Sequence, residues 1–177
     1  MSTPTESAVI VPVPAADSVV ARFRAELDPA ARLGVPAHVT VISPFVAPGR
    51  IDRDVLAVLT ETVGSVSAFD ATFSRVSWFS DSVVWLAPEP SDRFRALTDL
   101  VFARFPDCPP YGGIHDEIVP HLTIGQNGGL KEMRTAAQVI DQSLPINMRV
   151  DRIALIQGCD DVGSWHTVAE LPLACPP

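Results

Sequence analysis

The chain has 177 residues, 47% of them hydrophobic and 19% charged, a composition that favours a folded domain with a buried core over a disordered or fibrous protein. Thirteen basic and 21 acidic residues give a formal net charge of −8, so we expect no broad nucleic-acid-binding surface. Neither a membrane-spanning apolar run nor a secretory signal pattern is visible, and we therefore expect no membrane partner, a cytoplasmic location and a monomer.

Short apolar strands and amphipathic helices alternate along the chain, which indicates a mixed α+β fold. Asp52 and Ser91 precede two of the helical patterns and are predicted to cap them. In chain order the patterns predict a strand over 8–13, a helix over 16–27, a strand over 38–43, a helix over 52–63, strands over 69–79 and 83–87, a helix over 91–105, a strand over 119–125, a helix over 130–142, and strands over 147–157 and 165–173.

The order of these elements suggests an internal repeat. A helix, a strand that begins with histidine, a second helix and two adjacent strands occur twice, and the two histidine strands start 83 residues apart (His38 and His121). Each copy would leave one apolar sheet face uncovered, so two copies packed face to face would bury it. We therefore expect residues 1–177 to form a single domain built from two repeated lobes.

The two histidine strands carry the same alternating pattern, HVTVIS from His38 and HLTIGQ from His121. Side chains at i and i+2 of a strand share one face, so each histidine projects with the threonine two residues later, Thr40 or Thr123. The intervening aliphatic residues point to the opposite, core face. Each polar face then offers an imidazole and a hydroxyl roughly 6 to 7 Å apart.

Two imidazoles across a cleft suit a reaction in which one group takes a proton and another gives one, because imidazole titrates near neutral pH. The threonine hydroxyls can donate hydrogen bonds to a phosphoryl oxygen and stabilise the charge that builds in its transition state. His38, Thr40, His121 and Thr123 are therefore the candidate catalytic set, for phosphodiester chemistry without a required metal.

These paired H-x-T-x segments, about eighty residues apart, resemble those of the two-histidine (2H) phosphoesterase superfamily. The flanking residues fit as well, since HVTVISPF continues into Pro44 and Phe45, and HLTIG is preceded by Pro120. The resemblance extends from Ala8 to Leu173. It implies an α+β fold with two pseudo-symmetric lobes, whose antiparallel sheets line a central cleft and whose helices lie outside.

The same resemblance implies a metal-independent phosphodiesterase acting on a 2′,3′-cyclic phosphate or 2′-5′ phosphodiester of a nucleotide or RNA end. One assignment has His121 activating water and His38 protonating the leaving ribose oxygen, and the reverse stays open. A non-catalytic nucleotide- or phosphate-binding module and a 2′-5′ RNA ligase are the alternative functions. The acidic balance of the chain argues against a long RNA substrate.

Several aromatic residues are further candidates for the site. Phe45 follows the first motif strand and is the candidate substrate-binding residue near the mouth of the cleft. Four aromatic residues are weaker stacking candidates, because packing roles are commoner for them. They are Trp78, Trp85, Tyr111 and Trp165.

A metal site is a further alternative, built on His115, Asp116, Glu117 and His121. Their spacing does not match an H-E-x-x-H helix, and the glycines before them predict a loop. The three cysteines are widely spaced and lack the C-x-x-C pattern. We therefore expect no metal and no cofactor. His166 lacks a threonine at i+2 and is expected to lie outside the site.

Overall fold

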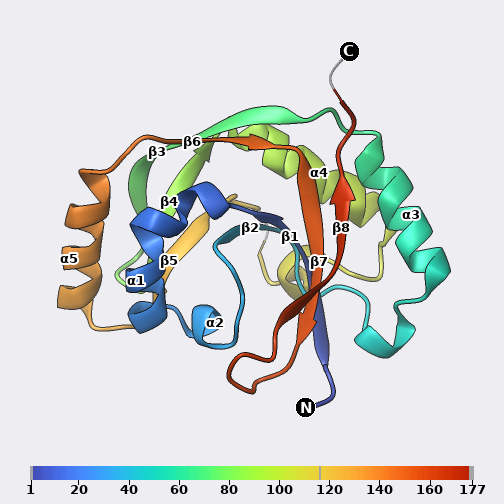
Figure 1. The fold of residues 1–177 in the computed structure, drawn as a ribbon, viewed down its shortest axis with the longest axis horizontal. Helices are drawn as coiled ribbons and strands as arrows, with labels where there is room; N and C mark the ends of the chain where they lie inside the picture. The colour runs from blue at the N-terminus through green and yellow to red at the C-terminus, as the bar shows by residue number, and fades with distance from the viewer. Residues whose placement is uncertain (1, 116, 176–177) are drawn as a thin grey trace.

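The computed structural model describes residues 2–115 and 117–175, which form two four-stranded antiparallel sheets with helices around them (Figure 1). The helices are α1 (Asp17–Leu27), α2 (Pro29–Arg32), α3 (Arg53–Gly64), α4 (Ser91–Arg104) and α5 (Leu130–Asp141). The strands are β1 (Glu6–Pro12), β2 (His38–Ile42), β3 (Phe69–Phe79), β4 (Val83–Glu89), β5 (Leu122–Gln126), β6 (Ile146–Val150), β7 (Arg152–Gly158) and β8 (His166–Pro172).

The two sheets have similar strand orders, each with a motif strand at one edge. The first sheet runs β2-β1-β7-β8 and the second runs β5-β4-β3-β6. In each sheet the strand of a histidine motif is at the edge, beside the strand that precedes it in sequence. The expected α+β class with two similar antiparallel sheets is thus confirmed. The first sheet takes its strands from both ends of the chain, however, while the second is formed by the middle.

Both motif strands turn their aliphatic residues into the protein interior. Val39 and Val41 of β2 are 1% and 3% exposed, and Leu122 and Ile124 of β5 are fully buried. All four belong to one hydrophobic core, to which both sheets contribute. The predicted alternation is therefore confirmed, and the polar side of each motif strand faces away from this core.

Two helices join the sheets, because each follows a strand of one sheet and packs against the motif strand of the other. Helix α1, which leaves the first sheet, packs against β5 of the second, and α4, which leaves the second, packs against β2 of the first. A Cβ atom on Gly125 would lie 2.8 Å from Cβ of Leu27, so only glycine permits this approach of α1 to β5. On the other side, the Thr98 hydroxyl of α4 donates to the Val41 carbonyl of β2 at 2.8 Å.

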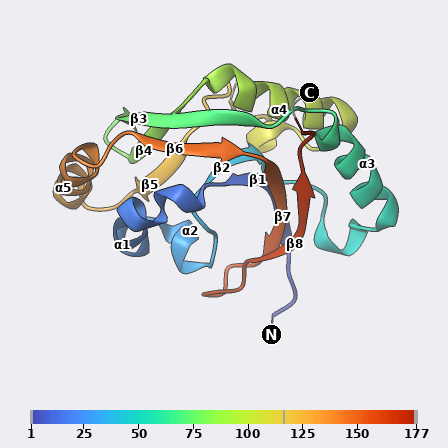
Figure 2. The same ribbon diagram turned by 45° about the horizontal axis from the view of Figure 1, so that its top comes forward.

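Some sequence predictions are corrected by the structure. The strand expected over 147–157 is two strands, β6 and β7, because the chain bends at Asp151 and passes from the second sheet to the first (Figure 2). The strand expected from residue 119 begins only at Leu122. Asp52 caps α3 as predicted, through hydrogen bonds from the Asp54 and Val55 amides. Ser91 instead starts α4 and makes no capping bond.

Helix α2 was not predicted. It is a single turn whose first residue, Pro29, needs no amide partner, and the Asp28 carboxylate caps it by accepting from the Ala30 amide at 3.0 Å. None of the helices in the described parts of the chain has the length and apolar character that a membrane crossing needs.

Candidate active site

The two motif strands meet at the centre of the molecule. Cα atoms of β2 and β5 come within 8 Å of each other although the strands belong to different sheets. His38 and Thr40 are half-buried on β2, as is Thr123 on β5, and half-buried His121 directly precedes β5. His38 and His121 are close enough for a charge on one to lower the pKa of the other. The structure thus brings the four predicted residues into one region.

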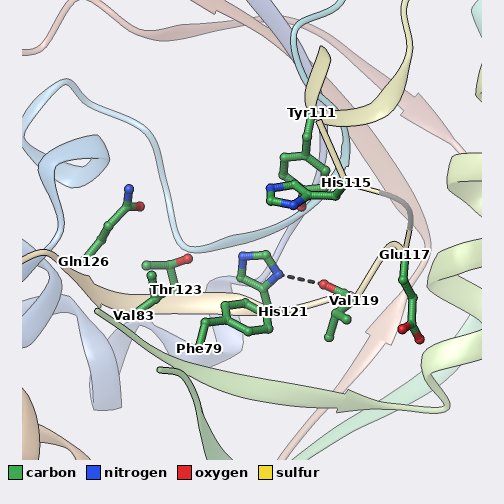
Figure 3. A pocket seen from close by; sticks show the side chains of 9 residues that line it. All are labelled: Phe79, Val83, Tyr111, His115, Glu117, Val119, His121, Thr123 and Gln126. Carbon is green, nitrogen blue, oxygen red and sulfur yellow. Dashed lines mark hydrogen bonds between the residues drawn. The ribbon is translucent and has the colours of Figure 1, made fainter. Parts of the chain in front are cut away.

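Each imidazole is held by the same backbone contact. Nδ1 of His38 donates to the Pro36 carbonyl at 2.8 Å. Nδ1 of His121 donates to the Val119 carbonyl at 2.7 Å, a contact that Figure 3 shows. A carbonyl oxygen only accepts, so the proton must be on Nδ1 in both rings. In the neutral ring Nε2 then carries the lone pair, and this nitrogen is available to take a proton from a substrate or water.

Burial favours the neutral form of both imidazoles. It lowers the pKa of His38 from 6.5 to about 4, against the opposing hydrogen bond to the Pro36 carbonyl. It also lowers the pKa of His121, where the hydrogen bond to Val119 again opposes the shift. With no anion bound, both motif histidines are therefore neutral at pH 7.

The second motif opens onto a cavity of about 470 Å³. His121 and Thr123 line it from the strand side, with Phe79 and Val83 beside them, and Figure 3 shows the aromatic ring of Tyr111 on the opposite side. Among the described lining residues none is Arg or Lys. The remaining lining residues are His115, Glu117, Val119 and Gln126.

Aromatic rings surround His121. Phe79 approaches its imidazole edge-on with ring centroids 5.1 Å apart, and Trp85 does so at 5.8 Å. Tyr111 lies nearly parallel to it, at 6.4 Å and 16°. These apolar neighbours are the physical cause of the burial that lowers the His121 pKa.

Tyr111 also connects the two motifs. Its hydroxyl interacts with the Thr40 side chain of the first motif, while its ring faces His121 of the second. It reaches this position with a left-handed backbone, φ 51° and ψ 33°, at the start of a turn that Gly112 and Gly113 continue at positive φ. Such strain in a non-glycine residue is common at functional sites.

The structure does not bring Phe45 to this cavity. Its side chain is buried, packs edge-on against Phe105 with centroids 4.9 Å apart, and lines a second cavity beside Arg50 and Arg104. Little of the ring is left for stacking on a substrate at His121.

Of the four weaker stacking candidates, Trp85 and Tyr111 lie at His121, as described above. Trp78 packs against the main core, and the Trp165 indole donates to the Cys159 carbonyl at 3.1 Å. His166 is exposed, as expected, on β8 at the far edge of the first sheet.

The alternative metal site has limited support. His115 lines the cavity with His121, while Asp116 lies outside the described residues. Within residues 2–115 and 117–175 no three His, Cys, Asp or Glu side chains are grouped as a metal site.

Sequence reasoning missed Phe79 entirely and left Tyr111 as one aromatic candidate among several. Phe79 ends β3, and its ring stacks on Trp85 at 4.7 Å, a contact set by the β3–β4 pairing. An aromatic residue next to the predicted turn at 80–82 was the available signal. Tyr111 could have been singled out by the glycines that follow it.

Two histidine motifs on the facing edge strands of two similar sheets define a protein of the two-histidine phosphoesterase class. A sequence model of the 2′-5′ RNA ligase superfamily matches residues 11–161, and the chain belongs to that superfamily. None of the curated protein sequences compared with the chain matches it significantly.

Solved structures agree on the fold. Escherichia coli LigT without ligand superposes with a TM-score of 0.63 at 18% identity, over 98% of this chain and 99% of LigT. The LigT complex with 3′-AMP gives 0.62 at 15% identity, over 97% and 99%. The protein TT0787 of Thermus thermophilus gives 0.66 at 16% identity, over 97% of this chain and all of TT0787. The chain therefore has a LigT-like fold along nearly its whole length.

Proposed function

We propose that this protein is a metal-independent phosphodiesterase that hydrolyses the 2′,3′-cyclic phosphate of a nucleotide or RNA end. The observation that carries the proposal is the meeting of the two His-x-Thr motifs, on β2 and at the start of β5, each with its imidazole Nδ1–H bound to a backbone carbonyl. In each motif the neutral imidazole therefore keeps its lone pair on Nε2, where it can take a proton. A module that only binds phosphate has no need of two proton-transfer groups.

The reaction can be written with the residues present. One neutral imidazole takes a proton from water at Nε2 as the water oxygen bonds to phosphorus. The bond from phosphorus to one ribose oxygen breaks, and the other histidine, protonated in the enzyme–substrate complex, gives its proton to that oxygen. The hydroxyls of Thr40 and Thr123 donate to the phosphoryl oxygens as their charge increases. The product is a phosphomonoester.

The lowered pKa of His38 supports a specific assignment of the two roles. A ring with a pKa of about 4 stays neutral, which suits the general base, and His121 is then the acid. This is the reverse of the first assignment made from the sequence. A bound phosphate raises the pKa of a neighbouring imidazole, so the protonated form of His121 is expected in the complex.

The cavity supports a small substrate. A volume of about 470 Å³ with aromatic walls suits one nucleoside, and the described lining offers no Arg or Lys for a chain of further phosphates. The crystallisation of E. coli LigT with 3′-AMP and with ATP agrees with a nucleotide in this cleft.

The test is incubation of the purified protein with the four nucleoside 2′,3′-cyclic monophosphates and detection of phosphomonoester. We expect hydrolysis that persists in EDTA and is lost in a His38→Ala, His121→Ala double variant. Binding without turnover would favour the non-catalytic module. Activity lost in EDTA and restored by a divalent ion would reject the metal-free mechanism.

A further inference from the structure

The backbone that holds His38 is itself held by an arginine. The carbonyl of Pro36 accepts the His38 Nδ1–H, and the preceding carbonyl, that of Val35, accepts from Nη2 of Arg24 at 3.3 Å. Arg24 is buried on α1 and forms an ion pair with buried Asp28 at 2.7 Å. Neither carbonyl belongs to a strand, since β2 begins at His38 itself.

The second motif repeats this arrangement. The carbonyl of Val119 accepts the His121 Nδ1–H, and the preceding carbonyl, that of Ile118, accepts from Nε of Arg95 at 3.2 Å. Arg95 is half-buried on α4. Thus in both motifs an arginine holds the carbonyl three residues before the histidine, and the histidine holds the carbonyl two residues before itself.

The two arginines are equivalent in fold and in sequence. Helix α1 connects β1 to β2 and α4 connects β4 to β5, so each helix follows the neighbour of a motif strand. Both helices contain the same tetrapeptide, Arg-Phe-Arg-Ala, at 22–25 and at 93–96. In each copy it is the second arginine that reaches the backbone before the histidine.

We propose that Arg24 and Arg95 are a pair of positioning residues, which hold the two imidazoles in the Nδ1–H tautomer by fixing the peptide just before the carbonyl that each ring binds. This inference rests on the proposed two-histidine chemistry. A guanidinium is always charged, and its bond to a carbonyl is stronger than a neutral one. Fixing one peptide plane limits how far the next carbonyl can turn away from the ring.

The Nδ1–H contact matters for both roles, because it leaves a lone pair on Nε2 of a neutral base and it aims Nε2 of an acid at the leaving oxygen. If the contact loosens, the ring can exchange to the Nε2–H form and turn, so a base loses its lone pair at Nε2 and an acid loses the orientation of its Nε2–H. Arg24 and Arg95 do not touch the reacting atoms in this scheme, so their effect passes through the histidines.

The test compares two substitutions of Arg95, to Gln and to Met. Gln keeps a hydrogen-bond donor near the position of Nε, and Met removes it. The amide nitrogen of Gln is as many bonds from Cα as Nε of Arg, and the terminal methyl of Met occupies the same place without an N–H. Arg93→Met is the matched control, because Arg93 is exposed on the same helix and its guanidinium lies over the Phe69 ring at 5.8 Å. All variants are labelled with ¹⁵N-histidine for NMR and assayed for kcat and KM.

We expect Arg95→Met to shift part of the His121 signal from the Nδ1–H to the Nε2–H tautomer and to lower kcat on the order of tenfold, with KM nearly unchanged. Arg95→Gln and Arg93→Met should match the wild type in both respects, and the His38 signal should not move in any variant.

The proposal is overturned if His121 keeps its tautomer and kcat in Arg95→Met, or if Arg95→Gln loses as much as Arg95→Met. It is also overturned if Arg95→Met fails to fold while Arg95→Gln folds, because the donor is then needed for the structure alone. The tautomer is measured without substrate, so a wild-type protein that cleaves no cyclic phosphate would refute the proposed function and leave this test in force.

Discussion

The burial of His38 should make the folded protein sensitive to acid. In the unfolded chain this imidazole titrates near its ordinary pKa of 6.5, whereas burial lowers its pKa in the folded protein to about 4. Above pH 6.5 both states hold the neutral ring, and His38 contributes no pH dependence. Between these two values only the unfolded state binds the proton, so the native state loses stability as the pH falls.

The size of the effect follows from the two pKa values. A difference of one pKa unit corresponds to about 1.4 kcal/mol, so the loss approaches roughly 3 kcal/mol well below the folded pKa of about 4. At about pH 4.5 the same linkage gives a loss of about 2 to 3 kcal/mol relative to about pH 7.5. This is a large part of the free energy that stabilises an ordinary domain.

Urea unfolding of the wild type and of His38→Gln at these two pH values measures the contribution of the ring. The carboxylates titrate in both proteins and cancel in the comparison, so the wild type should lose about 2 to 3 kcal/mol more than the variant. His166→Gln, changed on an exposed edge strand, should follow the wild type. Equal losses in the wild type and His38→Gln would refute the argument that burial holds this imidazole neutral.

Four further predictions concern activity and stability. Changing His38 or His121 to Ala should each slow turnover by about 10² to 10⁴, and changing both should cost little more, because they act on one transition state; fully additive losses in steady-state kinetics would contradict this. Changing either motif threonine to Val should lower kcat, because it removes roughly 3 kcal/mol of transition-state stabilisation. Circular dichroism should show an intact fold. The pKa values of both motif histidines are lowered, so kcat/KM should already be falling with rising pH below pH 6.5. The profile of kcat should extend to higher pH, because bound phosphate favours the protonated ring. A kcat/KM profile centred at or above pH 7 would be inconsistent with the burial of the rings. Arg24→Met should cost about 3 to 5 kcal/mol in urea unfolding because it leaves the Asp28 carboxylate buried without its partner, and Asp28→Asn added to it should recover part of the loss.

Local patterns were sufficient for the parts of the structure that depend on local residues. The alternation of polar and aliphatic residues in HVTVI and HLTI placed the histidine and threonine on one face, because the pleat of a strand allows no other arrangement. Asp52 could be recognised as a cap since its contacts are with Asp54 and Val55, two and three residues later.

The parts that could not be predicted depend on residues far apart in the chain. Val150 and Ile153 are both buried, so the apolar pattern runs on through Asp151 and gives no sign that the chain changes sheets there. Phe45 was expected at the mouth of the cleft because of its place in the sequence. Its actual position is set by Phe105, sixty residues later, at the end of α4.

The first sheet combines β1 and β2 with β7 and β8, which lie far later in the sequence. This has a consequence for protein synthesis. Residues 69–150 contain every strand of the second sheet, so a nascent chain can pair these strands before it is finished. The first sheet must wait for β7 and β8, which end at Pro172, although β2 with its histidine left the ribosome long before. A chain released after β6 would keep both motifs in its sequence but lack the partner of β1 on which the first motif depends. The first motif therefore gains its full sheet only after β7 and β8 have been translated.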